Sequence, residues 1–182
     1  MERVADIREF WRACARDGRY LFFAVALPLF LVSSFFRQKS LGAGGGSARE
    51  RMDPRAPARA YLENMRHLDA ICRSRGIRFA AVLQPYNGIG ERPLTEADRV
   101  IVSAARRAPG PGGGSRLDFL SAYYAAIRAR GKDEAFFADF TRVFDRVEGQ
   151  VFFDNIHFSD RGQEIVGRAL VELVKSREGE ER

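Results

Sequence analysis

Asp154 and His157, three residues apart near the end of the chain, have the types and the spacing of an acid–base pair. A carboxylate at this spacing can accept the Nδ1 proton of the imidazole, fix its tautomer and stabilise the imidazolium. In a nucleophilic hydrolase, such a pair takes the proton from the attacking group. The same spacing also arises by chance, with the acid capping a helix and the histidine on the surface. Whether the residues form an acid–base pair or a helix cap beside a surface histidine depends on the secondary structure predicted around them.

An apolar segment leads into the pair and an amphipathic helix follows it. Gln150–Phe153 is a short β-strand candidate, and Ser159 or Asp160 can cap a helix predicted from about Gln163 to Lys175. This arrangement places His157 between the end of a strand and the start of a helix. The helix has one apolar face, formed by Ile165, Val166, Ala169, Leu170, Leu173 and Val174.

The block around the pair resembles the last motif of the SGNH (GDSL-type) hydrolases. That motif has an Asp, two further residues, the catalytic His, a polar turn with a glycine, here Gly162, and a closing helix. Two other segments are similar to the same family: Asn64–Pro85, a helix running into an apolar strand, and Phe137–Asp145, just upstream of the pair. The resemblance covers about Tyr61 to Val174.

The resemblance implies a fold and a reaction. The fold would be α/β, a three-layer α/β/α arrangement with a mostly parallel, flavodoxin-like sheet that is incomplete at its N-terminal side. His157 would be the general base and Asp154 the residue that orients it, in a serine esterase or acyl-ester hydrolase. Substrates would be acyl esters of small molecules, glycans or lipids, and no metal or cofactor is implied.

The chain departs from the family in its nucleophile, which stays unknown. No Gly-Asp-Ser occurs, and the nearest match, Gly45-Gly46-Ser47, is typical of a flexible linker. One hypothesis is that the chain is the C-terminal, truncated part of such an enzyme and supplies only the Asp-x-x-His half of the site. The other is a non-catalytic protein, either a membrane-tethered pseudo-hydrolase or an interaction module.

Asn87 is a candidate substrate-binding residue. It follows the apolar strand predicted at Ile77–Leu83, and ligands of open α/β sheets bind beyond the carboxyl ends of the strands. Asn87-Gly88 is also a strong turn signal, so a plain turn is the alternative. The second of the two histidines, His67, lies on the polar side of its predicted helix and is expected at the surface.

Periodicity predicts alternating helices and strands, as in an α/β sheet. We expect residues 1–60 to form an N-terminal helical and hydrophobic segment with a Gly-, Pro- and Arg-rich loop, and residues 61–182 the hydrolase-like portion. The predicted helices cover residues 1–19, 61–75, 93–107 and 117–130, the short strand candidates 136–140 and 150–153, and the loops 41–60 and 109–115.

The uncharged run Tyr20–Phe36 has two interpretations. It is long enough for a short membrane-spanning helix, and it could equally be a buried helix of a soluble domain. Residues 1–19 and 37–56 carry equal numbers of basic residues, so the flanks set no orientation. The sequence therefore leaves cytoplasmic and membrane-associated locations open.

The charge pattern and the cysteine spacing argue against nucleic-acid binding and against a cysteine-based metal or redox site. The net charge is +6, but the basic residues are interleaved with acidic ones and form no nucleic-acid motif, so we expect no nucleic-acid partner. Cys14 and Cys72 lie far apart, outside any metal-ligand or redox spacing, and are expected to be buried thiols.

Overall fold

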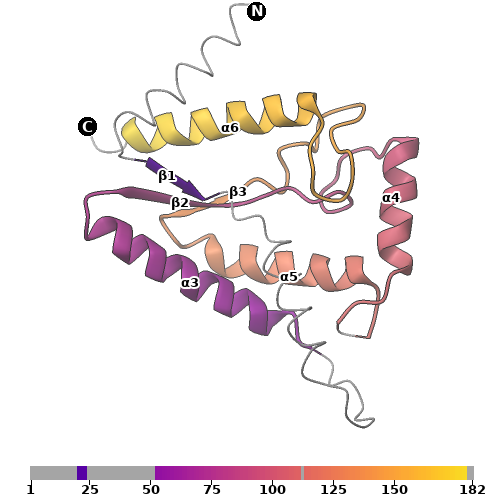
Figure 1. Cartoon of the computed structure of the whole chain (residues 1–182), viewed down its shortest axis with the longest axis horizontal. Helices are drawn as coiled ribbons and strands as arrows, with labels where there is room; N and C mark the ends of the chain where they lie inside the picture. Colours follow the sequence, from indigo (N-terminus) through magenta and orange to yellow (C-terminus); the bar gives the residue numbers. More distant parts are fainter. Residues whose placement is uncertain (1–19, 24–51, 112, 180–182) are drawn as a thin grey trace, which may run out of the picture.

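The computed structural model describes residues 20–23, 52–111 and 113–179. Within them, strands and helices alternate around a small parallel sheet with the strand order β1-β2-β3. The strands are β1 (Tyr20–Phe23), β2 (Arg78–Leu83) and β3 (Phe137–Asp139); the helices are α3 (Arg55–Arg73), α4 (Glu96–Arg107), α5 (Arg116–Gly131) and α6 (Asp160–Gly179) (Figure 1).

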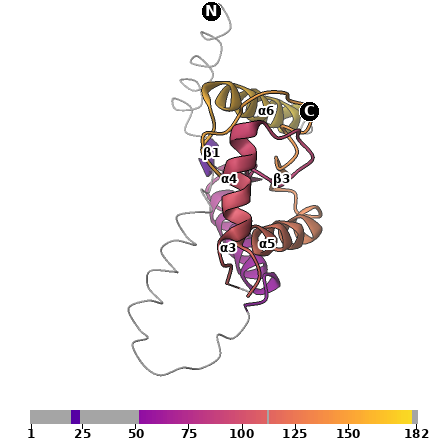
Figure 2. The ribbon, with the colours of Figure 1, turned by 90° about the vertical axis from the view of Figure 1, so that its right-hand side faces the viewer.

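The helices lie on both sides of the sheet. In Figure 1, α3 and α5 lie below the strands and α6 lies above them. Helix α4 stands across the end toward which the strands point, and Figure 2 shows it face on between the levels of α6 and α5. The α/β class is therefore as expected, and the loops at the carboxyl ends of the strands gather near α4.

Helix α3 starts earlier than predicted. It begins at Arg55, so the loop predicted over residues 41–60 is wrong for residues 55–60, and the expected boundary at residue 60 falls inside a helix. Pro57 is in the first turn, where a missing N–H costs nothing, and the Arg55 N–H donates to the Asp53 side chain at 2.9 Å. Prolines read as loop signals are here helix-start residues.

Helices α4 and α5 are confirmed, with polar caps at their starts. The Thr95 side chain accepts from the Asp98 N–H while the Asp98 side chain accepts from the Thr95 N–H, a capping box. Ser115 caps α5 by accepting from the Asp118 N–H at 3.0 Å. These caps satisfy N–H groups that a helix start leaves open.

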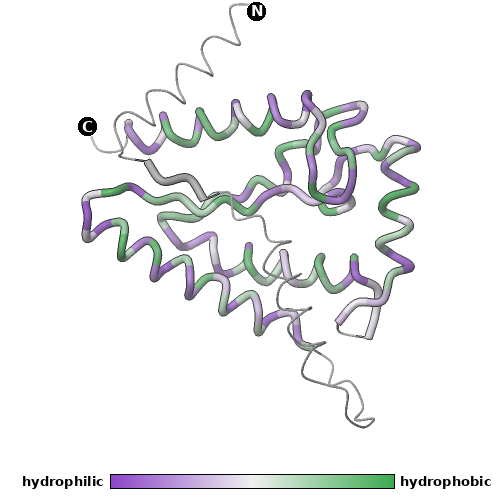
Figure 3. The backbone as a smooth tube through the Cα atoms, in the orientation of Figure 1, coloured by the Kyte–Doolittle hydropathy of each residue, from purple (hydrophilic) through white to green (hydrophobic). Residues whose placement is uncertain are grey.

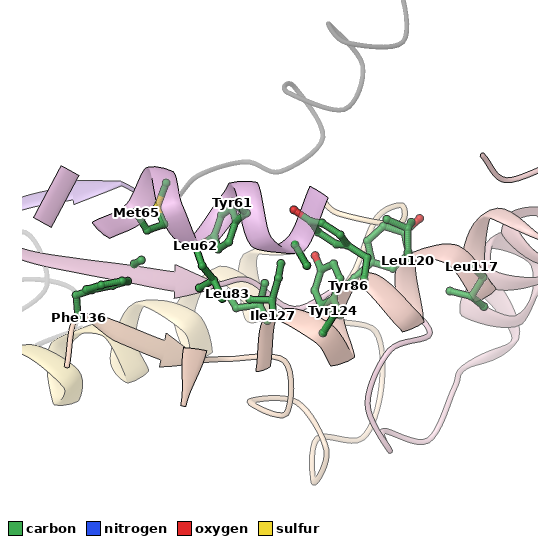
Figure 4. Packing of buried hydrophobic residues seen from close by; sticks show 14 of the residues in the cluster. Tyr61, Leu62, Met65, Leu83, Tyr86, Leu117, Leu120, Tyr124, Ile127 and Phe136 are labelled. Atoms are coloured by element: carbon green, nitrogen blue, oxygen red, sulfur yellow. The ribbon is translucent and has the colours of Figure 1, made fainter. Parts of the chain in front are cut away.

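The core lies between β2 and the helix pair α3 and α5. Figure 3 shows hydrophilic and hydrophobic residues alternating along α3, as a helix with one buried face requires. In Figure 4, side chains of α3, β2 and α5 meet in one layer, among them Tyr61, Leu62, Leu83 and Tyr124. Burial raises the pKa of Tyr61 to about 12, so this phenol stays protonated.

The start of the apolar run Tyr20–Phe36 is a strand. β1 pairs with β2 in parallel, with Phe22 opposite Ala80, so both helical interpretations are wrong for residues 20–23. A short apolar, aromatic run fits a strand as well as a helix, and pairing with β2 decides it. Residues 24–36, the helix predicted over 1–19, Cys14 and Gly45-Gly46-Ser47 lie outside the described residues. Among the residues that the structure describes, no helix is long and apolar enough to cross a membrane.

The two short strand candidates, Cys72 and His67 can also be compared with the structure. The strand candidate at 136–140 is confirmed as β3, whereas the candidate at 150–153 is only an isolated antiparallel bridge between Phe152 and Phe158. Cys72 is a buried free thiol and His67 is exposed, both as expected.

Candidate functional site

Asp154 and His157 form a hydrogen-bonded pair. His157 Nδ1 lies 2.6 Å from Asp154 Oδ2, and Asp154 Oδ1 accepts the N–H groups of Ile156 and His157, each at 2.8 Å. The carboxylate therefore holds both the imidazole and the backbone of the turn that carries it. The histidine side chain is 71% exposed and that of Asp154 50%, so the pair faces solvent.

The electrostatics of the pair fix its proton arrangement. Burial pushes the pKa of Asp154 up, but the hydrogen bonds from the His157 side chain, from the His157 and Ile156 backbone, and the histidine's charge hold it below its ordinary value. Asp154 is thus ionised at neutral pH and can only accept. When the His157 ring carries a single proton, that proton lies on Nδ1, toward Asp154, and the Nε2 lone pair can accept a proton.

A narrow two-stranded turn carries the pair. The Phe153 N–H donates to the His157 carbonyl at 2.8 Å, directly after the bridge between Phe152 and Phe158. The rings of Phe144, Phe152 and Phe158 pack together with centroids 5.3 to 5.6 Å apart. This aromatic cluster anchors the base of the turn.

The start of α6 closes the other side of the turn. The Ser159 hydroxyl accepts from the Gly162 N–H and donates to the Gln150 carbonyl, each at 3.2 Å, so Ser159 is the cap. A Cβ on Gly162 would lie 2.3 Å from the Val151 carbonyl oxygen. Glycine is required there because the helix passes too close to the backbone for any side chain.

Asn87 lies against the same turn. Its N–H donates to the Asn155 carbonyl at 2.9 Å, and its side-chain amide donates to the Asp154 carbonyl at 3.3 Å and to Asp98 Oδ1 at 3.0 Å. The residue is 0% exposed. The structure therefore brings together all three residues that the sequence singled out, with Asn87 behind the pair and not at the surface.

A buried ion pair behind Asn87 was missed by sequence reasoning. Asp98 is 0% exposed and Arg92 6%, with 2.7 Å between their charged groups. Burial raises the pKa of Asp98, but hydrogen bonds from Thr95 and Arg92 outweigh it, so the pKa is lowered. The Arg92 guanidinium also lies 5.7 Å from the centre of the Phe152 ring. Asp98 lies in the first turn of α4, three residues after its cap Thr95, and no local sequence signal pairs it with Arg92.

A small hollow lies beside this network. Its lining includes Gly90, Arg92, Thr141 and Phe152. The Thr141 hydroxyl oxygen is buried and has no hydrogen-bond partner among the described residues. His157 does not line this hollow; the pair lies on the exposed side of the turn.

No nucleophilic side chain is hydrogen-bonded to His157 among the described residues. No serine hydroxyl there is hydrogen-bonded to His157, and that of Ser159 serves the start of α6. Tyr86 lies near Asp154, but its pKa is raised, by burial and by that carboxylate against a lowering by Arg116, so it is a protonated phenol. Nor does this part of the chain gather three or more metal-ligating side chains.

The arrangement can orient an imidazole and accept a proton at Nε2. Comparisons with protein-family models, with curated proteins and with solved structures gave no match to the chain.

Proposed function

We propose that Asp154 and His157 are the acid–base half of an SGNH-type serine hydrolase site that acts on acyl esters. The single observation that carries the proposal is the 2.6 Å contact between His157 Nδ1 and Asp154 Oδ2 in a turn that leaves the His157 side chain 71% exposed. A helix-capping Asp beside an unrelated surface histidine would not need this contact.

In the proposed reaction, His157 Nε2 accepts the proton of a serine hydroxyl while the serine oxygen bonds to the ester carbonyl carbon. The carbonyl π electrons move to the oxygen and return as the bond to the alcohol breaks. The alcohol leaves with the proton that His157 had accepted. Water then repeats the sequence on the acyl-serine, releasing the acid and restoring the serine. Asp154 stays ionised and stabilises the imidazolium throughout.

We further propose for this chain the three-layer α/β/α, flavodoxin-like arrangement with a sheet that is incomplete at its N-terminal side. It is supported by the parallel pairing of β1, β2 and β3 and by helices on both sides of these strands. The pair follows β3 in the chain, as the family motif requires.

The substrate we propose is a small-molecule, glycan or lipid ester with an apolar acyl group. Phe153 and His157 are joined across the turn, one step beyond the buried bridge of Phe152 and Phe158. Because side chains alternate between faces, Phe153 and His157 share the outward face. Phe153 is 62% exposed and offers an apolar surface for the acyl chain.

A non-catalytic role, as a pseudo-hydrolase or interaction module with or without a membrane tether, is the second candidate. It is favoured by the lack of Gly-Asp-Ser in the sequence and by the lack of a serine bonded to His157 among the described residues. The two candidates differ in one measurable property, a reactive serine.

Covalent labelling of the purified full-length chain with a fluorophosphonate probe tests the proposal. We expect stoichiometric labelling of the parent, loss of labelling in His157→Ala, and a rate reduced by about 10⁴ in Asp154→Asn, since a neutral amide supports the wrong tautomer. Peptide mapping would then identify the serine.

His67→Ala is the matched control, because it removes the other, exposed histidine and should label like the parent. A folded parent chain that takes up no probe would show that it holds no serine activated by His157. That result would refute the hydrolase reaction for this chain and leave the truncated half-site or the non-catalytic candidate. Labelling that persists in His157→Ala would show a reactive serine that works without this pair.

A further inference from the structure

We propose that Asn87 is a positioning residue for the acid–base pair, because it ties the Asp154–His157 turn to the buried Arg92–Asp98 ion pair. The inference rests on the proposed function, since positioning has a chemical consequence only where the pair transfers protons.

The first step is the contact between Asn87 and the turn. Two consecutive carbonyls of the turn, those of Asp154 and Asn155, accept hydrogen bonds from Asn87, one from its side-chain amide and one from its backbone N–H. These carbonyls belong to the backbone between the carboxylate and the imidazole. Holding them limits how far the two side chains can move apart.

The second step is the anchor on the other side. Asp98 Oδ1 accepts from Asn87, while Oδ2 accepts from the Thr95 N–H at 2.9 Å and the Thr95 hydroxyl at 2.6 Å and pairs with Arg92 at 2.7 Å. The carboxylate is thus fixed at the capped start of α4. Such charge-assisted bonds in a buried site are among the strongest in proteins.

The third step explains why the residue is an asparagine. Its amide nitrogen has two protons, and the two acceptors take one each. An aspartate would place a second carboxylate against Asp98, and a serine has only one proton to donate. Either replacement would leave a buried carbonyl or carboxylate oxygen without its donor, which lowers the stability of the folded protein.

Nuclear magnetic resonance of the full-length chain tests the inference directly at the turn. In Asn87→Ala, which keeps the backbone bond to Asn155, we expect amide exchange of Ile156 and His157 to become about tenfold faster. We also expect the low-field signal of the His157 Nδ1 proton to broaden or disappear, which a change in packing elsewhere would not cause.

Thr95→Ala is the matched control. It removes a partner of Asp98 and weakens the start of α4, but leaves both bonds of the Asn87 amide in place. Exchange of the α4 first-turn amides should rise while Ile156, His157 and the Nδ1 signal stay as in the parent. If Asn87→Ala does not fold, Asn87→Ser is used, because its single proton should give a smaller change of the same kind.

Unchanged exchange at Ile156 and His157 together with an unchanged Nδ1 signal in a folded Asn87 variant would overturn the inference. The same would follow if all core amides changed equally, since Asn87 would then act on overall stability. Both readouts are independent of fluorophosphonate labelling, so failure of the hydrolase proposal and failure of the positioning role are distinguishable.

Discussion

At the residue scale, Asp154 uses its two carboxylate oxygens for different partners. Oδ2 holds the His157 ring and Oδ1 holds the Ile156 and His157 N–H groups. One side chain thus fixes both the orientation of the imidazole and the turn that presents it. The exposed pair is backed by residues with almost no exposure, Asn87 and Asp98.

His157→Ala should raise the pKa of Asp154, because the side-chain hydrogen bond and the charge of His157 are among the causes that lower it. Since the folded-state pKa is the lower one, the contribution of Asp154 to stability is present above its unfolded value, about 3.9, and is lost as pH falls through the folded value. Carbon-13 titration of the Asp154 carboxyl measures the shift. His67→Ala should leave the titration unchanged, and an unchanged curve in His157→Ala would contradict the contact.

Asp98→Asn should destabilise the protein by about 3–5 kcal/mol at neutral pH, because it leaves the buried Arg92 charge without its partner. The pKa of Asp98 is also lowered, so the parent should lose stability as pH falls below about 4 and the variant should lose less over the same range. Urea unfolding between pH 3 and about 7 measures both effects.

Glu96→Gln is the control for Asp98→Asn, because Glu96 lies two residues away in the same helix turn and is exposed. Its effect should stay within about 0.5 kcal/mol. Equal effects of the two substitutions would mean that the buried ion pair contributes nothing particular.

At the element scale, neighbouring phenylalanines of the turn should differ sharply. Phe152 is 2% exposed and packs on Phe144 and Phe158, so Phe152→Ala should cost about 3–5 kcal/mol of unfolding free energy. Phe153 is 62% exposed, and Phe153→Ala should change stability by less than about 0.5 kcal/mol. Denaturant unfolding of both variants decides it, and similar losses would mean that the alternation of faces is wrong.

Two glycines of α6 make a second matched pair. Gly162→Ala brings a Cβ to 2.3 Å from the Val151 carbonyl oxygen and should destabilise by about 1–3 kcal/mol. Gly167→Ala meets nothing within 4 Å and should stabilise by about 0.5–1 kcal/mol, because it removes a helix-interior glycine. Thermal unfolding of both variants measures the two signs. A stabilising Gly162→Ala would show that α6 does not pass so close to the turn.

The element scale is also where sequence reasoning worked best. Helix α4 has one apolar face and a capping box, and β2 is a compact apolar run between Gly76 and Pro85. The predicted bounds of these two elements and of α5 lie within a few residues of the observed ones. The contacts that complete the site are not local: Asn87 meets Asp154 across 67 positions. The residues next to Asn87 in the sequence do not indicate that Asp154 is its partner. Only its position directly after a parallel strand suggests a functional role.

At the scale of the whole molecule, the first residues of the N-terminal apolar run belong to the sheet as strand β1. The sequence offered a membrane helix or a buried helix, and the described part of the run is the strand Tyr20–Phe23. A four-residue apolar stretch carries no period that separates the two structures. Its pairing with β2, almost sixty positions further along the chain, is long-range information that composition does not contain.

Amide exchange along β2 tests whether β1 is part of the sheet. The Ala81 N–H donates to the Phe136 carbonyl on the β3 side, and successive N–H groups of a strand inside a sheet point to opposite neighbours. We therefore expect the Ala80 N–H to point toward β1 and to exchange on the order of a hundredfold or more slower than an open amide.

The control is Phe23→Pro, because in this parallel register the N–H that faces the Ala80 carbonyl is that of Phe23, the residue after its aligned partner, and proline removes it. Exchange of Ala80 should then accelerate while Ala81, bonded on the β3 side, stays protected. Fast exchange of Ala80 in the parent chain would separate Tyr20–Phe23 from the sheet and return the apolar run to its two helical interpretations, a membrane-spanning helix or a buried one. Slow exchange of Ala80 would show that Tyr20–Phe23 pair with β2. The apolar run would then begin in the same sheet in which β2 leads to Asn87 and β3 precedes the acid–base pair.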